Sequence, residues 1–209
     1  MAYNSPESEQ IVTDARKNDA EFDKQVSMLE SSDVTYSFNY LGVVDYKKAA
    51  DDGESLNGST GTDGEQVLLN FTKTKNSLND GELSSLYHET EHGVQFEHGE
   101  LGFAKNESGD WTAAKESYDV TDEINAFQAG WNAPGASKAA GEKFGNKDLE
   151  GQIKYVGRKS DTYRTMAKEG QQALKRGNSP AKNYPAAKGA QRTIRRLNVF
   201  FKSYKKRTP

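Results

Sequence analysis

Two histidines and a glutamate in the middle of the chain could bind a metal ion and use it. His88, Glu89 and His92 form the pattern HExxH within the segment LYHETEHGVQF. Residues four apart lie one above the other on a helix, so both imidazoles can reach one ion while Glu89 points toward its open side. Zinc with three protein ligands keeps a position for water, lowers the pKa of that water to about 7, and leaves Glu89 to take its proton. The motif predicts a hydrolase with Zn²⁺ as cofactor and Glu89 as general base.

Two residues compete for the position of third metal ligand. His98 follows His92 by six residues, as in HExxHxxGxxH metallopeptidases, but Gln95 stands where that pattern has glycine. Glu123 lies in YDVTDEINAFQ, thirty-one residues after His92, on a second expected helix. A carboxylate that points inward beside apolar side chains is costly to bury unless a positive charge meets it, and an ion would supply that charge. We therefore prefer Glu123 and keep His98 as the alternative.

Further side chains near the two motifs could support the chemistry. Asp122 is expected either to accept the outward ring N–H of a ligating histidine or to cap its helix. The oxyanion that develops during hydrolysis needs a donor besides the metal. The sequence does not rank the candidates, which are Tyr118, Tyr155, Tyr163, Arg158 and Arg164.

Hydrophobic periodicity indicates the elements that position these residues. The HExxH motif lies on an expected helix with Asp80 as N-cap and Gly99 as its stop, and a second helix over 122–131 is expected to be capped by Thr121. Loops or irregular chain are expected over 51–66, 99–118 and 133–145. The other expected elements are a helix over 6–30 opened by Ser5 and Pro6, strands over 34–43 and 67–71, a helix over 151–177 with a break near Gly157, and an amphipathic helix over 187–201.

Composition sets the class of protein. The 209 residues suit one domain, with an N-terminal region 1–66, a metal-site core 67–131 and a basic helical region 150–209. We expect an α+β fold, mostly helical with a small β-sheet. The mean hydropathy of −0.92 excludes a membrane span. Because the chain has no cysteine, any metal site must use His, Asp and Glu.

Charge is distributed unevenly along the chain. The net charge is −9 over residues 1–66, −7 over 67–157 and +13 over 158–209. A basic segment such as RTIRRLNVFFKSYKKR could bind an anionic partner, including nucleic acid. The same segment can instead pack on the acidic remainder through the apolar face of its expected helix. We favour packing, and nucleic acid is not an expected partner.

The two motifs together resemble a known family. LYHETEHGVQFEHGELGF followed by YDVTDEINAFQAGW is similar to the zincin-like metallopeptidase domains of Rhs-type and related polymorphic bacterial toxins, over residues 67–131. The resemblance implies zinc at His88, His92 and Glu123, Glu89 as general base, and a zincin-like fold. Members often carry an aliphatic and a small residue where this chain has Thr90 and Glu91, so a second acid would stand beside the metal.

The resemblance also implies a biological setting. A toxin effector would act on a protein or peptide substrate and would have an immunity protein that covers its cleft. The N-terminal MAYNSPESEQ has neither the basic start nor the apolar stretch of a secretory signal, so we expect a carrier or secretion system to deliver the chain into a target cell. Two alternatives remain open: a catalytically silent metal-binding interaction module, and an anion-binding or nucleic-acid-binding protein that acts through the basic C-terminal helix.

Overall fold

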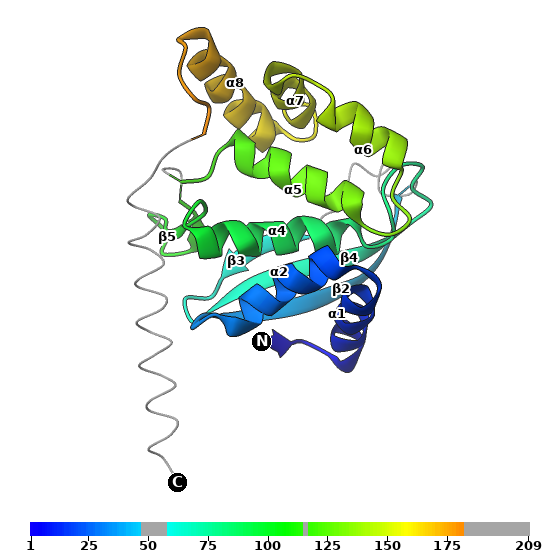
Figure 1. The fold of residues 1–209 in the computed structure, drawn as a ribbon. Coiled ribbons are helices and arrows are strands. Elements are labelled where there is room, and N and C mark those ends of the chain that lie inside the picture. The colour runs from blue at the N-terminus through cyan, green and yellow to red at the C-terminus, as the bar shows by residue number, and fades with distance from the viewer. Residues whose placement is uncertain (47–57, 115–116, 182–209) are drawn as a thin grey trace.

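The structure is a computed structural model that describes residues 1–46, 58–114 and 117–181. Helices and a small mixed sheet build it, which confirms the expected α+β class (Figure 1). In chain order the elements are β1 (Ala2–Tyr3), α1 (Pro6–Asn18), α2 (Ala20–Ser31), β2 (Thr35–Asp45), β3 (Ser59–Thr62), β4 (Gln66–Lys75), α4 (Ser84–His98), β5 (Phe103–Lys105), β6 (Trp111–Ala113), α5 (Val120–Asn132), α6 (Lys138–Gly145), α7 (Leu149–Val156) and α8 (Asp161–Lys175).

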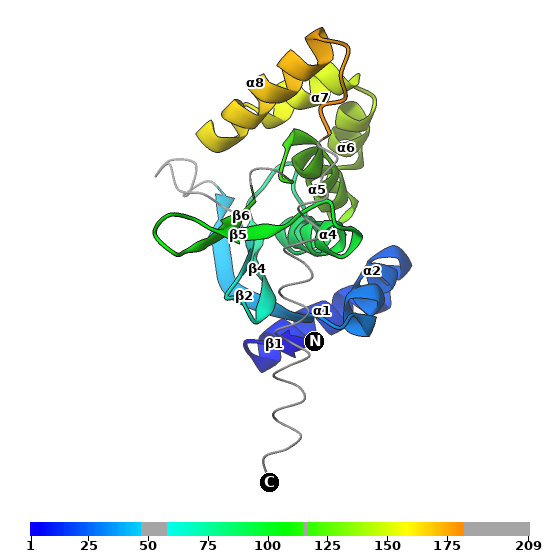
Figure 2. The same ribbon diagram turned by 90° about the vertical axis from the view of Figure 1, so that its left-hand side faces the viewer.

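The main sheet supports the central helix. Its strand order is β1-β2-β4-β3, with β1, β2 and β4 parallel and β3 antiparallel to β4. The register pairs Tyr36 with Val67 and Phe38 with Leu69, and all four side chains are fully buried. Alternate residues of a strand share a face, so these pairs form one apolar surface. Helices α1, α2 and α4 lie on the same side of the sheet (Figure 2).

The helix expected over 6–30 is two helices. Ser5 caps α1 and Pro6 opens it, as predicted, but α1 ends at Asn18 and α2 begins at Ala20. Between them Asp19 has an extended backbone, and its carboxylate accepts the N–H groups of Glu21 and Phe22. A short acidic side chain competes well for backbone donors, and here it stops one helix and starts the next.

Three segments expected to be loops contain regular structure. Residues 59–62 form β3, although 51–57 lie outside the described residues. Residues 103–105 and 111–113 pair as the β5–β6 hairpin, and 138–145 form α6. These short pieces carry little hydrophobic periodicity of their own. Backbone pairing with a neighbouring strand, or burial of one side chain such as Phe144, decides their structure.

The helix caps also differ from the prediction. Helix α4 begins at Ser84 without a side-chain cap, so Asp80 is not its N-cap, whereas Gly99 ends it in a left-handed conformation as expected. Asp119, not Thr121, caps α5, and the Asp119 N–H donates to the Asp122 carboxylate, which completes a capping box. The carboxylate two residues earlier reaches the free N–H groups of the first turn, which Thr121 is placed too late to do.

The C-terminal helices form a layer beyond the central pair. Helix α5 packs on α4, and α6, α7 and α8 follow on the far side of α5 (Figure 1). The expected break near Gly157 is confirmed by the end of α7 at Val156. The helix expected over 187–201 lies outside the described residues. No helix in the described ranges combines the length and apolar character needed to cross a membrane.

Candidate metal centre

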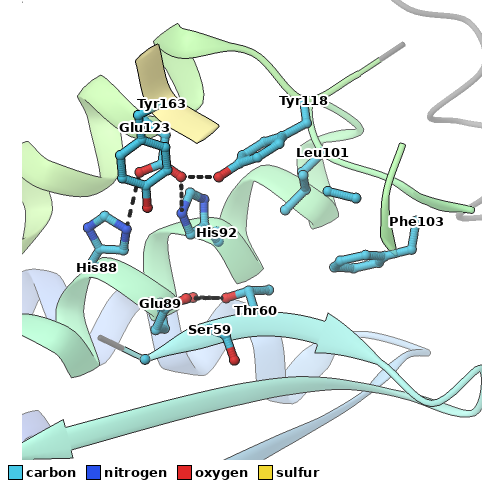
Figure 3. A pocket seen from close by; sticks show the side chains of 12 residues that line it. Ser59, Thr60, His88, Glu89, His92, Leu101, Phe103, Tyr118, Glu123 and Tyr163 are labelled. Carbon is cyan, nitrogen blue, oxygen red and sulfur yellow. Dashed lines mark hydrogen bonds and ion pairs between the residues drawn. The ribbon is translucent and has the colours of Figure 1, made fainter. Parts of the chain in front are cut away.

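Helices α4 and α5 face each other across a close contact. A Cβ built on Gly130 would lie 3.1 Å from the carbonyl oxygen of Ser84 and 3.8 Å from the Cβ of His88. Because glycine has no side chain, α5 can approach α4 closely at His88. His88 and His92 project from α4 and Glu123 from the first turn of α5 into the space at this contact (Figure 3).

The three side chains lie close enough together to hold one metal ion. The Nε2 of His88 lies 3.5 Å from Glu123 Oε2, and the Nε2 of His92 lies 3.3 Å from Glu123 Oε1. One ligand atom from each residue fits within a 4.8 Å group. A tetrahedral zinc ion bound at about 2.0–2.1 Å separates its ligand atoms by about 3.4 Å. The donor set His, His and Glu therefore fits zinc.

The buried carboxylate of Glu123 needs a positive partner. Its side chain has no exposed area, and Oε2 has no hydrogen-bond partner among the described residues. Burial favours the neutral acid, but the hydrogen bond and the charge of His92 outweigh it and lower the pKa of Glu123, while Glu123 raises the pKa of His92. Burial lowers the pKa of His88 to about 4, which keeps that ring neutral as metal binding requires. An orphaned buried oxygen beside two imidazoles is the observation that most favours a cation here.

Gln95 fixes the ring of His92. The side-chain Nε2 of Gln95 donates to the backbone carbonyl of Asp122 at 2.9 Å, and its Oε1 lies 2.7 Å from His92 Nδ1. Since the amide nitrogen is already committed, the oxygen accepts the Nδ1–H, so Nε2, which lies beside Glu123, is the nitrogen that would lose its proton and bind a metal ion. The role expected of the Asp122 carboxylate thus belongs to Gln95. The Asp122 carboxylate instead caps α5, and only its carbonyl group joins this chain of hydrogen bonds.

Glu89 is held by a strand that the sequence did not reveal. It is buried on α4, and Thr60 of β3 donates from Oγ1 to Glu89 Oε2 at 2.7 Å (Figure 3). A Cβ on Gly58 would come within 2.7 Å of Glu89 Cγ, so the chain entering β3 must pass close to this side chain. Burial raises the pKa of Glu89 to about 7, although the His92 charge and the Thr60 hydrogen bond oppose this. A carboxylate with a pKa near neutrality is suited to a general base.

A cavity of about 180 Å³ contains these groups. It is lined by Gly58, Ser59, Thr60, His88, Glu89, His92, Leu101, Phe103, Ala113, Tyr118, Glu123 and Tyr163. The hydroxyl of Tyr118 donates a short hydrogen bond to Glu123 Oε1. Burial, followed by the charge of Glu123, raises the pKa of both Tyr118 and Tyr163, so both are hydroxyl donors at neutral pH. Of the five oxyanion candidates, these two reach the cavity.

The remaining candidates lie elsewhere. His98 is exposed at the end of α4 and is not part of the metal-ligand group. Tyr155 packs among the rings of Phe127, Trp131 and Phe144, and Arg164 pairs with Asp161 on α8. Arg158 does not line the cavity.

Glu91 does not add a second acid to the centre. Its carboxylate accepts a hydrogen bond from Gln25 of α2 at 2.9 Å, and it is not a cavity residue. Thr90, the other departure from the family pattern, is fully buried and donates to the carbonyl of Leu86 within α4. Thr90 and Glu91 therefore serve the packing of α4.

Comparison with other proteins gives no family assignment. No protein-family model, curated protein or solved structure matches the chain. The interpretation of the site therefore rests on the residues and their geometry.

Proposed function

We propose that the protein is a zinc-dependent metallopeptidase. The observation that carries the proposal is the convergence of His88, His92 and the orphaned carboxylate of Glu123 in one cavity with Glu89. Zinc bound there would polarise a peptide carbonyl and activate a water molecule. No cysteine is present to make a closed structural zinc site, and three protein ligands leave a coordination position open.

Side chains of the cavity carry out the proton transfer and the stabilisation of the oxyanion. Glu89 takes a proton from the attacking water and delivers it to the leaving amine. Thr60 holds the Glu89 carboxylate in the cavity through its hydroxyl group. The hydroxyl of Tyr163 supplies a donor for the developing oxyanion, whereas the single donor hydrogen of Tyr118 is used by Glu123.

Metal content and cleavage test this proposal together. Wild-type protein should bind one zinc per chain and cleave unfolded casein, and chelation should abolish both. His88→Ala should lose the zinc. Glu89→Gln should keep the zinc and lose cleavage by about 100-fold to 10,000-fold, the usual contribution of a general base. Zinc binding without any effect of Glu89→Gln on cleavage would identify a silent metal-binding module and contradict the enzyme.

We further propose that the peptidase is a toxin effector delivered by a carrier and neutralised by an immunity protein. The support is the resemblance of two motifs, HExxH at His88–His92 and the segment that contains Glu123, to those of zincin-like toxin domains. Expression inside a bacterial host should arrest growth for the wild type and not for Glu89→Gln. Growth arrest that persists in Glu89→Gln, resists chelation and involves a salt-sensitive anion complex would favour action through the basic C-terminal segment instead.

A further inference from the structure

The cavity has an apolar end that the proposed hydrolysis does not use. Leu101, Phe103 and Ala113 line it there, whereas the metal-ligand group and Glu89 line the other end. In Figure 3, Leu101 and Phe103 lie beyond His92 on the side away from His88. We propose that this end is a binding subsite for one aliphatic side chain of the substrate, and that Ala113 sets its depth. The inference rests on the proposed peptidase function and names its substrate class.

Leu101, Phe103 and Ala113 form the wall of the apolar end, and the last two belong to the β5–β6 hairpin. Phe103 and Ala113 are paired directly across the two strands, so their side chains lie on the same face of the hairpin. Leu101 precedes Phe103 by two residues. The neighbouring Thr112 points to the opposite face and is exposed.

The wall is anchored on both sides. The ring of Phe103 stacks on Phe96 of α4 with ring centroids 5.5 Å apart. Trp111 packs over Gly64, where a Cβ would lie 2.9 Å from its Nε1. Leu101 and Phe103 are each only 2% exposed. A wall held between the central helix and the β3–β4 turn is preformed, as binding sites for side chains usually are.

The chemistry of the lining selects the class of side chain. Among the described residues that line the cavity none is lysine or arginine, so an acidic side chain in the apolar end would lose its water without a basic side chain to pair with. The carboxylates are already engaged, Glu123 by the histidines and Tyr118 and Glu89 by Thr60. A lysine head group among Leu101, Phe103 and Ala113 would therefore lose its water without gaining a partner.

The size of the cavity suits a leucine side chain. Its whole volume is about 180 Å³, a little more than an apolar cavity of about 150 Å³ that holds benzene. Because the metal-ligand group and Glu89 line part of that volume, the apolar end has less room than the whole cavity, and a four-carbon side chain fits there.

Peptides with a single side chain test the subsite. The probes are acetyl-Gly-Gly-Xaa-Gly-Gly-amide with Xaa as Leu, Phe, Gly, Asp or Lys, titrated by calorimetry into zinc-loaded Glu89→Gln, which binds without cleaving. We expect the leucine peptide to bind about tenfold or more tightly than the glycine, aspartate and lysine peptides. Adding Ala113→Leu should remove that difference, and the matched change Thr112→Leu on the outer face should keep it. Equal affinities for all five peptides, or a preference that survives Ala113→Leu, would overturn the subsite.

A second measurement needs no change in the hairpin. The methyl NMR signals of Leu101 in zinc-loaded Glu89→Gln should shift with the leucine peptide and not with the glycine peptide, and unchanged signals would overturn the subsite even if Ala113→Leu fails to fold. Cleavage by the wild type separates the two proposals. Preferential binding of the leucine peptide without cleavage would support the subsite and contradict the peptidase. Cleavage with no preference among the five peptides would support the peptidase and overturn the subsite.

Discussion

Two groups of charged side chains join neighbouring helices in this protein, and they do so in opposite ways. At the α1–α2 contact, Arg16 pairs with Asp23 at 2.6 Å and with Glu30 at 2.8 Å, and the two carboxylates are 46% and 39% exposed. At the α4–α5 contact, the Glu123 carboxylate has no exposed area and one oxygen without a hydrogen-bond partner. The first group balances its own charge in contact with water. The second is buried, pairs one carboxylate oxygen with His92 and leaves the other oxygen without a hydrogen bond, and that difference distinguishes a candidate metal site from a structural ion pair.

The largest expected effect is a loss of zinc affinity, and it should occur only when the buried group at the α4–α5 contact is changed. Glu123→Gln preserves the shape of the side chain but removes the charge that the ion needs, and should weaken zinc binding by about 1,000-fold, more than the loss of an outer hydrogen-bond partner. The matched change Glu30→Gln at the α1–α2 contact should leave zinc binding unchanged. Competition with a fluorescent zinc chelator measures both. Similar zinc affinities for the two variants would refute the metal assignment at Glu123.

Zinc should also stabilise one contact and not the other. Because the folded chain presents the site and the unfolded chain does not, zinc at about 100 times its Kd should add about 2.7 kcal/mol to the free energy of unfolding. Denaturant titrations with and without a chelator measure this difference. Arg16→Met should show the same gain from zinc as wild type, while Glu123→Gln should show none. A gain retained in Glu123→Gln would place the binding elsewhere.

Breaking the hydrogen bonds between His92, Gln95 and the Asp122 carbonyl should weaken zinc binding less than Glu123→Gln does. Gln95→Leu removes the acceptor that holds the Nδ1–H and should weaken zinc binding by about 10-fold to 100-fold. Gln95→Glu, which keeps an acceptor at the same place, should bind zinc more tightly than Gln95→Leu. The chelator competition assay applies here too, with circular dichroism as the check on folding. Equal losses in the two variants would mean that Gln95 acts through packing alone.

Thr60 should affect catalysis without affecting the metal. Thr60→Val keeps the shape but removes the donor to Glu89, and should lower kcat/KM on casein-derived peptides by about tenfold, the strength of one hydrogen bond to a charged group. Thr60→Ser should retain most of the activity, and both variants should bind zinc like wild type. If serine does not rescue the loss, the hydroxyl group is not what positions Glu89.

The smallest expected effect is the loss of stability when the partly exposed ion pairs of Arg16 are removed. Arg16→Met should cost about 1 kcal/mol of stability, as expected for a partly exposed ion pair. Urea denaturation measures it, and zinc affinity should not change. We expect the α1–α2 and α4–α5 contacts to be independent. A loss of zinc binding in Arg16→Met would show that they are coupled and would contradict this.

Sequence reasoning anticipated the relative positions of side chains where a short spacing along one helix carries the information. The HExxH spacing places His88 and His92 on one side of α4, and Gly99 ends that helix as expected. The preference for Glu123 over His98 came from the cost of burying a carboxylate, and the structure brings Glu123 rather than His98 to the two histidines. These inferences needed only the geometry of one helix and the energetics of one side chain.

The sequence did not reveal the roles of Thr60 and Gln95, because each depends on a contact with another element. Thr60 lies in the short strand β3, whose residues Ser, Thr, Gly and Thr carry no apolar alternation. Gln95 was noted only as a departure from a glycine, and the carbonyl of Asp122 that orients it comes from another helix. The one available signal was a polar residue, Gln95, three positions after His92 and therefore on the same face of the helix.

The relative positions of His88, Glu89 and His92 follow from the sequence alone, because a helix has a fixed rise and rotation per residue. The contacts that hold these side chains in place arise only in the folded chain. The strand that holds Glu89, the amide that orients His92 and the hairpin that forms the apolar wall contact the site through long-range pairing and packing. Those contacts depend on how separate elements bury one another's surfaces, and no local spacing encodes that.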